Sequence, residues 1–200
     1  MKNKIKQQIL NLVKENGILR PRDLDPVGIP REYLKRLYFN GYLKKVGRGL
    51  YILDNKEIDE YQTIMEACKR VPNGVISLMT ALQYHELTTQ VPFEVWMAIE
   101  RTVWLPKVDG TIIRFFRFSG PSFTEGIIKK KVNGVSMKIY NPAKTVADCF
   151  KYRNKIGIDV AIEALRDCIQ SHKCTFDEIM NYAKICRVAN VIKPYMEAMI

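Results

Sequence analysis

Residues 28–53 read GIPREYLKRLYFNGYLKKVGRGLYIL, a stretch that predicts one helix followed by a β-hairpin. Pro30 suits the first position of a helix and Gly41 lies just past its end, so we expect a helix from Pro30 to Asn40. The residues spaced for burial on one face are Leu34, Leu37 and Tyr38, and those left facing outward are Arg31, Glu32, Lys35, Arg36 and Phe39. Two short apolar runs flank the Gly-Arg-Gly sequence at 47–49, which is typical of a hairpin whose turn glycines adopt positive φ.

Two shorter helical segments precede this stretch. Residues 2–15 carry apolar residues at helical spacing, and Gly17 follows where a helix C-cap favours glycine. Residues 18–24 predict a short extended step and a brief second helix, which the Asp25-Pro26 pair ends. Three helices followed by a hairpin form a winged helix-turn-helix, which we place in a domain spanning residues 1–55.

The remainder of the chain, residues 56–200, is predicted to form a second, α+β domain beyond a polar boundary at 54–60. The expected helices span about 57–70, 78–87, 141–153, 159–171, 176–186 and 191–200, and the expected strands span 95–99, 111–118 and 135–139. The dipeptides Asp109-Gly110 and Asn133-Gly134 favour tight turns, so we expect a small, mainly antiparallel sheet with helices gathered at its C-terminal end.

The distribution of charge points to a polyanionic partner. The chain of 200 residues has 32 Lys and Arg against 21 Asp and Glu, a formal net charge of +11. The first 56 residues hold thirteen basic and five acidic side chains, whereas the other 144 hold nineteen and sixteen. This asymmetry would draw nucleic acid to the N-terminal domain, and the alternative is a merely soluble basic surface. No apolar run approaches the length of a membrane span, so we expect a soluble, cytoplasmic protein.

The cysteines and histidines predict neither disulfides nor a metal site. Five cysteines without a secretory signal fit reduced, buried thiols better than a disulfide framework. The one conceivable zinc set is Cys168, His172, Cys174 and Cys186. It lacks a Cys-x-x-Cys knuckle, and Cys168 falls within a strong helical pattern, so we expect no metal and no other cofactor.

Motifs of hydrolases, nucleotide-binding loops and metalloproteases are absent from the sequence. Ser77 and His85 could be imagined as a nucleophile and its base. Ser77 is better explained as a helix cap and His85 as a lone histidine near a helix end. We therefore expect no catalytic residues and no enzymatic activity.

Two charged motifs in the second domain are open to more than one interpretation. The three lysines at 129–131 are expected in a solvated turn beside a strand, with contact to nucleic acid or an acidic partner as the alternative. Within NPAKTVAD at 141–148, Lys144 and Asp148 are spaced to meet across one helical turn. Lys144 either pairs with Asp148 or holds an acidic group of a partner.

The chain resembles the AbiE-type abortive-infection antitoxins, the regulatory half of bacterial type IV toxin-antitoxin pairs. The resemblance is carried by IPREYL at 29–34, VGRGLY at 46–51, SLMTALQYH at 77–85 and above all YNPAKTVADCF at 140–150. Glu86 departs from the pattern, because glycine often follows the histidine in this family. The signature residues of the second domain are His85, Pro142, Lys144, Thr145 and Asp148.

The resemblance implies two linked roles. One is a transcriptional autorepressor that binds double-stranded DNA at inverted repeats upstream of its own operon. The other is an antitoxin that counteracts a nucleotidyltransferase-type toxin encoded beside it. In a type IV pair the antitoxin need not bind the toxin, so the resemblance leaves direct contact open.

The winged helix itself predicts which side chains meet DNA. The helix at 30–40 is expected to enter the major groove and contact base edges or phosphates, with Tyr33 as its lesser candidate, while the wing mainly adds sequence-independent affinity. Residues 20–22 are expected to clamp the backbone beside them. The predicted contacts are Arg20, Arg22, Arg31, Tyr33, Lys35, Arg36, Lys44, Lys45 and Arg48. Arg31→Ala should weaken specific binding more than non-specific binding.

Besides an enzyme, which would require metal- or nucleotide-dependent turnover, two further functions remain open from the residues alone. A ligand-sensing regulator would use an aromatic pocket in the second domain, formed by Trp96, Trp104, Phe115 and Phe116. The other possibility is a winged helix that serves only as a protein-interaction module, which predicts no salt-sensitive affinity for DNA.

Overall fold

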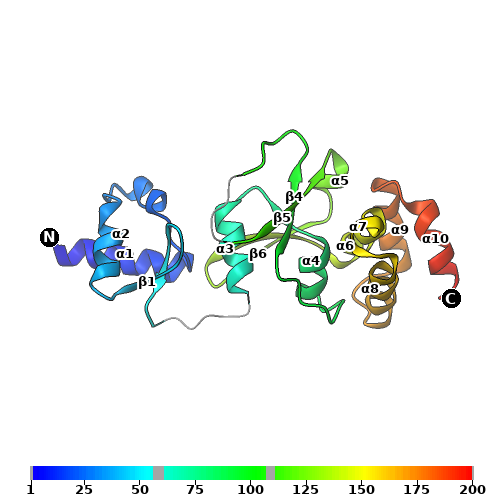
Figure 1. Ribbon diagram of the computed structural model, residues 1–200, viewed down its shortest axis with the longest axis horizontal. Coiled ribbons are helices and arrows are strands. Elements are labelled where there is room, and N and C mark those ends of the chain that lie inside the picture. The colour runs from blue at the N-terminus through cyan, green and yellow to red at the C-terminus, as the bar shows by residue number, and fades with distance from the viewer. Residues whose placement is uncertain (1, 56–60, 107–110, 200) are drawn as a thin grey trace. The chain divides into compact units, whose positions relative to one another are not determined.

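The computed structural model describes residues 2–55, 61–106 and 111–199, and divides the chain into two compact units (Figure 1). The first unit contains residues 1–72 together with 107–112 and 131–137. The second contains residues 73–106, 113–130 and 138–200. The domain boundary expected between residues 55 and 56 lies at the edge of 56–60, which are outside the described residues. Residues 109–110, expected to form a turn, also lie outside them.

The first unit is built as a winged helix-turn-helix. Its elements in chain order are α1 (Lys2–Asn16), the 3-10 helix η1 (Pro21–Val27), α2 (Glu32–Phe39), β1 (Leu43–Gly47) and β2 (Leu50–Leu53), followed by α3 (Gln62–Arg70). The strands β1 and β2 pair antiparallel, with Leu43 opposite Leu53 and Lys45 opposite Tyr51. Leu19 exchanges backbone hydrogen bonds with Tyr51 and so adds a short third strand, which is the extended step expected before the second helix. The predicted hairpin and the presence of three helices are confirmed. The Asp25-Pro26 pair does not end the second helix as we expected, because η1 continues through Pro26 to Val27 and ends at Gly28, whose φ is +65°.

The core of the first unit comes from the apolar faces of these elements. Side chains of α1, α2 and the hairpin form one buried cluster, whose members are Ile9, Val13, Leu19, Leu24, Ile29, Leu34, Leu37, Leu43 and Tyr51. Tyr38 was expected in this stripe, but 40% of it is exposed. Its ring contacts the rings of Phe39 and of Tyr51, which is a member of the cluster, so Tyr38 lies at the edge of the cluster.

Two glycines of the first unit bring the turn at residues 133–134 against the end of α1. Gly17 and Gly134 both have positive φ, which favours glycine. A Cβ atom at Gly17 would collide with the carbonyl oxygen of Asn133, and one at Gly134 would collide with the carbonyl oxygen of Glu15. The absence of side chains thus permits a close approach of two backbone segments.

The larger sheet has five strands in the order β5-β4-β3-β7-β6. These strands are β3 (Val75–Ile76), β4 (Val95–Glu100), β5 (Ile113–Phe118), β6 (Ile127–Val132) and β7 (Val135–Tyr140). The α+β class is confirmed. The sheet is mixed rather than mainly antiparallel, because β3 pairs parallel with β7, and β4 pairs parallel with β5. The tight-turn dipeptides could indicate only hairpins between neighbouring strands, whereas these parallel pairs join strands linked by longer connections.

The three lysines at 129–131 lie in strand β6 and not in the turn that we expected. Because β6 is an edge strand of the sheet, charged side chains suit it and help to prevent pairing with another chain. With three successive lysines, β6 lacks the alternation of apolar and polar residues by which strands are usually recognised in a sequence.

The helices of the second unit surround α6 (Figure 1). They are α4 (Leu78–Tyr84), α5 (Pro121–Thr124), α6 (Pro142–Lys151), α7 (Arg153–Ile156), α8 (Ile158–Gln170), α9 (Phe176–Ile185) and α10 (Ala189–Glu197). Asn141 caps α6 by accepting a hydrogen bond from the Lys144 amide, as the sequence predicted. Thr175 and Glu178 form a reciprocal cap at the start of α9. Helix α6 lies at the centre of the core of this unit, because it packs against α4, α8 and α9.

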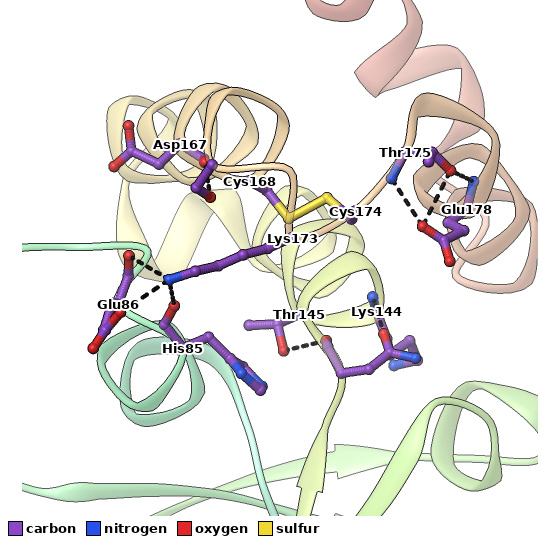
Figure 2. Close-up of a disulfide and its surroundings, with 12 residues drawn as sticks. His85, Glu86, Lys144, Thr145, Asp167, Cys168, Lys173, Cys174, Thr175 and Glu178 are labelled. Atoms are coloured by element: carbon purple, nitrogen blue, oxygen red, sulfur yellow. Dashed lines mark hydrogen bonds and ion pairs between the residues drawn. A yellow bond between two sulfur atoms is a disulfide. The ribbon is translucent and has the colours of Figure 1, made fainter.

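Cys168 and Cys174 form a disulfide, which corrects the expectation of free thiols at these two positions (Figure 2). The chain turns back after α8, with the amide of Lys173 donating to the carbonyl of Cys168, and this brings the two Cα atoms to 5.7 Å. Cys68, Cys149 and Cys186 are buried free thiols. Within the described ranges, no group of three or more His, Cys, Asp or Glu side chains could hold a metal ion. Among the described helices, none is both long and apolar enough to cross a membrane.

Candidate nucleic-acid interface

Helix α2 presents one apolar and one charged face. Leu34 and Leu37 are buried in the core of the first unit and fix the rotation of the helix. The outward face then carries exposed Arg31, Lys35 and Arg36. Tyr33 is half-buried at the border between the two faces. The structure therefore brings together the four side chains that the sequence assigned to the recognition helix.

Both arginines of this face are held by exposed carboxylates. Arg31 pairs with Asp25, its Nε donating to Oδ1 at 2.8 Å. Arg36 pairs with Glu32 one turn earlier on α2, at 2.8 Å. Hydrogen bonds from Arg31 lower the pKa of Asp25 below its usual range. The arginines are thus pre-oriented by carboxylates that a competing anion can replace, because water and salt screen exposed ion pairs and leave them weak.

Aromatic rings support the basic side chains of α2. The Arg36 guanidinium lies 5.1 Å from the ring centroid of Tyr33, and Lys35 Nζ lies 5.8 Å from that of Phe39. The Phe39 side chain is 71% exposed, as the outward position predicted. Such cation–π contacts limit the positions that the charged groups sample and keep them near the helix.

The two lysines of the wing point to opposite faces of the hairpin. Lys45 lies opposite Tyr51, so the two side chains share one face of the hairpin. Tyr51 belongs to the core cluster of the first unit, to which α2 also contributes, whereas Lys45 is exposed. Lys44 lies opposite Ile52 on the other face and is partly buried. A duplex docked along α2 would therefore meet Lys45 before Lys44.

Arg48 lies exposed at the turn of the wing, between two glycines with different roles. Gly49 has a φ of +69°, as expected for this turn. Gly47 does not adopt positive φ, which corrects that part of the prediction. Its lack of a side chain makes room for Arg70, since a Cβ atom there would lie 2.6 Å from Arg70 Nη2.

Arg20 and Arg22 occupy different environments. Arg20 is mostly buried and binds Asp23 at 2.8 Å, while its Nη1 donates to the Lys69 carbonyl. Burial raises the pKa of Asp23, but the hydrogen bonds from Arg20 and Lys69 outweigh burial and lower it overall. Arg22 is exposed on η1. Arg20 is therefore occupied in joining η1 to α3, whereas Arg22 faces solvent.

Arg70 is a basic residue of this region that the sequence did not reveal. It ends α3, and its Nη1 donates to the carbonyl oxygen of Arg48, 22 residues away, at 3.3 Å. Nothing local marks this contact, because it depends on how α3 packs beside the wing. Arg70 thereby extends the basic surface beyond the winged helix itself.

The signature residues of the second unit are mostly buried. Lys144 Nζ donates to both carboxylate oxygens of Asp148, at 2.7 and 2.6 Å, and neither side chain is exposed. The Cys186 thiol donates to the same carboxylate at 3.2 Å. Thr145 bonds the Asn141 carbonyl, and Pro142 begins α6. Of the two interpretations of Lys144, the structure therefore contains the internal pair with Asp148 and not a lysine left open to a partner.

His85 and Glu86 hold the end of α4 near the loop before α9 (Figure 2). The Nε2 atom of His85 lies 2.7 Å from the Tyr140 carbonyl, so this nitrogen carries the proton. Glu86 has a φ of +53°, so the turn for which glycine is usual is kept, and its carboxylate pairs with Lys173 at 3.2 Å. Ser77 is fully buried, and His85 is bonded to Tyr140 rather than to Ser77.

The aromatic residues considered for a ligand pocket do not lie together. Trp96 and Phe116 stack at 4.9 Å and are buried in the core of the second unit. Trp104 is 92% exposed, and Phe115 is half-buried. Core packing accounts for Trp96 and Phe116.

Comparisons with known proteins agree with this architecture. Residues 7–53 match the model of a family described as transcriptional regulator, AbiEi antitoxin. No curated protein sequence matches the chain significantly. Among solved structures, the crystal structure of the RV2827C protein from Mycobacterium tuberculosis is similar, with a TM-score of 0.59 and 11% sequence identity. This match covers 89% of the present chain and 70% of the other, and at this identity it shows the fold alone. Over residues 7–53 the chain is therefore similar to the AbiEi antitoxin family of transcriptional regulators, the family that its motifs resemble.

Proposed function

We propose that this protein represses its own operon by binding inverted repeats in double-stranded DNA, and that it is the antitoxin of a type IV pair. The observation that carries the DNA-binding role is the outward face of α2. There Arg31, Lys35 and Arg36 lie on one exposed surface of a helix whose other face is fixed in the core.

Helix α2 enters the major groove, and its arginines exchange their carboxylate partners for bases or phosphates. A bidentate pair between arginine and guanine contributes roughly 1–3 kcal/mol of discrimination. Arg48 and Lys45 on the wing contact phosphates and add affinity that is independent of sequence. Arg20 positions η1 for these contacts through its bonds to Asp23 and the Lys69 carbonyl.

The antitoxin role rests on the family match of residues 7–53 and on the resemblance of the second unit to the same family. The toxin it counteracts is of the nucleotidyltransferase type. Because Lys144, Thr145 and Asp148 are buried, they support this unit from within and do not themselves touch a partner. The protein acts through binding and not through catalysis, in the cytoplasm.

Fluorescence anisotropy with the DNA upstream of the protein's own gene tests repression, beside a scrambled duplex of equal length, at several salt concentrations. We expect tighter binding to the upstream DNA, with a log-log salt slope that corresponds to several phosphate contacts. Arg31→Ala should weaken binding to the upstream duplex more than to the scrambled one. Equal, weak binding of the wild-type protein to both duplexes would contradict the repressor role.

Co-expression with the gene adjacent to its own tests the antitoxin role separately. We expect the adjacent gene alone to arrest growth and co-expression of this protein to restore it. Growth arrest that persists despite soluble expression of this protein would contradict the antitoxin role while leaving the repressor role intact.

A further inference from the structure

Five arginines converge on one cavity of the first unit, with a volume of about 390 Å³. They come from four segments of the chain: the start of η1, the N-terminus of α2, the turn of the wing and the end of α3. The lining residues are Arg20, Pro21, Arg22, Arg31, Arg48, Gly49, Leu50 and Arg70. Among these described residues none is acidic.

The carboxylates near this cavity neutralise only part of its charge. Asp23 is bound by Arg20 and Lys69, and Asp25 is bound by Arg31. The Glu66 carboxylate lies near Arg70, since a Cβ atom at Gly47 would lie 3.4 Å from Glu66 Oε2 and 2.6 Å from Arg70 Nη2. Arg22 and Arg70 form no ion pair with any described residue. Like charges held together in this way repel one another, and a cavity lined by one sign of charge concentrates ions of the opposite sign.

Among the five arginines, Arg70 gives the strongest indication that the cavity binds an anion. Its Nη1 is held by the Arg48 carbonyl, whereas its Nε and Nη2 atoms are buried without a hydrogen-bond acceptor. A buried donor on a charged group is costly to leave unpaired. Gly47 provides the space in which Nη2 lies, so the backbone of the wing accommodates this guanidinium.

We propose that this arginine cavity is a binding site for a phosphate group. Planar guanidinium groups bind phosphate oxygens through paired hydrogen bonds, and several of them around one cavity match the tetrahedral anion from different sides. The phosphate belongs either to the DNA backbone or to a free phosphate compound such as a nucleotide. In the DNA case the inference rests on the proposed function and adds Arg70, from outside the winged helix, to the interface.

Calorimetric titration with inorganic pyrophosphate tests the cavity without DNA. We expect the wild-type protein to bind pyrophosphate, and Arg22→Gln and Arg70→Gln to weaken this binding about tenfold or more, because each variant loses charge-assisted hydrogen bonds to the phosphate oxygens. The matched control is Arg166→Gln, which removes an exposed arginine of α8 that does not line the cavity. If Arg70→Gln lowers the melting temperature, Arg22→Gln still tests the binding site, because Arg22 is exposed and its replacement should not destabilise the fold.

Salt-dependent anisotropy with a DNA duplex identifies the source of the phosphate. If it belongs to DNA, Arg22→Gln and Arg70→Gln each reduce the log-log salt slope by about 1, whereas Arg166→Gln does not. If both variants lose pyrophosphate binding but keep the wild-type slope, the ligand is a free phosphate compound. Pyrophosphate binding that is absent or equal in all four proteins, together with unchanged slopes, overturns the proposal. Failure of the wild-type protein to bind any duplex would refute the proposed function, and pyrophosphate alone would then decide the cavity.

Discussion

The two units place their ion pairs in opposite environments. On α2 the pair Arg36–Glu32 is 56% and 60% exposed, and the nearby pair Arg31–Asp25 is 60% and 47% exposed. In the second unit the pair Lys144–Asp148 has the same spacing of four residues along a helix as Arg36–Glu32, yet both of its side chains are 0% exposed.

This difference separates charges available for binding from charges that specify the fold. Exposed pairs are weak because water and salt screen them, so their arginines can exchange a carboxylate for a phosphate. A buried pair cannot be broken without leaving a charge in a poorly solvated interior. Rings of Tyr140 and Phe118 lie 4.1 and 5.0 Å from Lys144 Nζ and complete its enclosure.

The largest expected effect comes from breaking the buried pair. Asp148→Ala leaves the Lys144 ammonium without its counter-charge, so we expect the free energy of unfolding of the second unit to fall by about 3–5 kcal/mol. Tryptophan fluorescence during urea unfolding measures this selectively, because Trp96 and Trp104 both lie in the second unit.

The double variant Lys144→Met/Asp148→Leu is the control for this prediction. It removes both charges and replaces them with apolar groups, so it should lose much less stability than Asp148→Ala. A loss below about 1 kcal/mol for Asp148→Ala would show that the exposed and buried pairs do not differ as we infer.

Breaking an exposed pair should affect binding and not stability. Arg36→Ala is expected to weaken binding to the upstream duplex by about 1–3 kcal/mol and to change the free energy of unfolding by less than about 1 kcal/mol. Anisotropy and urea unfolding measure the two effects. Lys193→Ala is the matched control, since Lys193 forms a similar exposed pair with Glu197 on α10. An equal loss for the two variants would rule out a specific contact by Arg36.

His85, one of the signature residues, should make the stability of the second unit depend on pH. Burial lowers the pKa of His85 from its usual value of 6.5, assisted by the charges of Lys130 and Lys173 and opposed by the hydrogen bond to Tyr140. Below about pH 6.5 the unfolded chain therefore binds a proton that the folded chain does not, and the free energy of unfolding falls as pH decreases. Above that pH both states are neutral and His85 contributes no pH dependence.

Urea unfolding between pH 5 and 7.5, followed by tryptophan fluorescence, measures this dependence. The slope from one group is at most about 1.4 kcal/mol per pH unit. His85→Gln should flatten the curve in this range, whereas His172→Asn, which replaces an exposed histidine, should retain it. A slope that survives His85→Gln would assign it to other groups.

The smallest expected effect is a gain in DNA affinity. Glu32→Gln removes the carboxylate that holds Arg36 and repels phosphate, so binding should strengthen by about 0.3–1 kcal/mol. Anisotropy at low salt measures the gain, and Glu197→Gln on α10 is the matched control. Weaker binding of Glu32→Gln would mean that Glu32 orients Arg36 for the DNA instead of competing with it.

Local signals predicted the helices well. Pro30 and Gly41 bracket α2, and Gly41 has the positive φ of a helix end. Asn141 caps α6 as expected. The predictions failed where contacts with residues distant in the sequence determine the local structure. The lysines of β6 form a strand because they lie at the edge of a sheet, and Cys168 meets Cys174 because the chain turns back after α8.

The sequence by itself determined the α+β class, the winged helix and the concentration of positive charge in the first 56 residues. Helical periodicity, capping residues and turn dipeptides act over a few residues, and so they can be recognised along the chain. Only the tertiary structure decided that Lys144 and Asp148 are buried together and that Arg70 meets the wing. Those contacts depend on how distant elements pack, which no local spacing specifies.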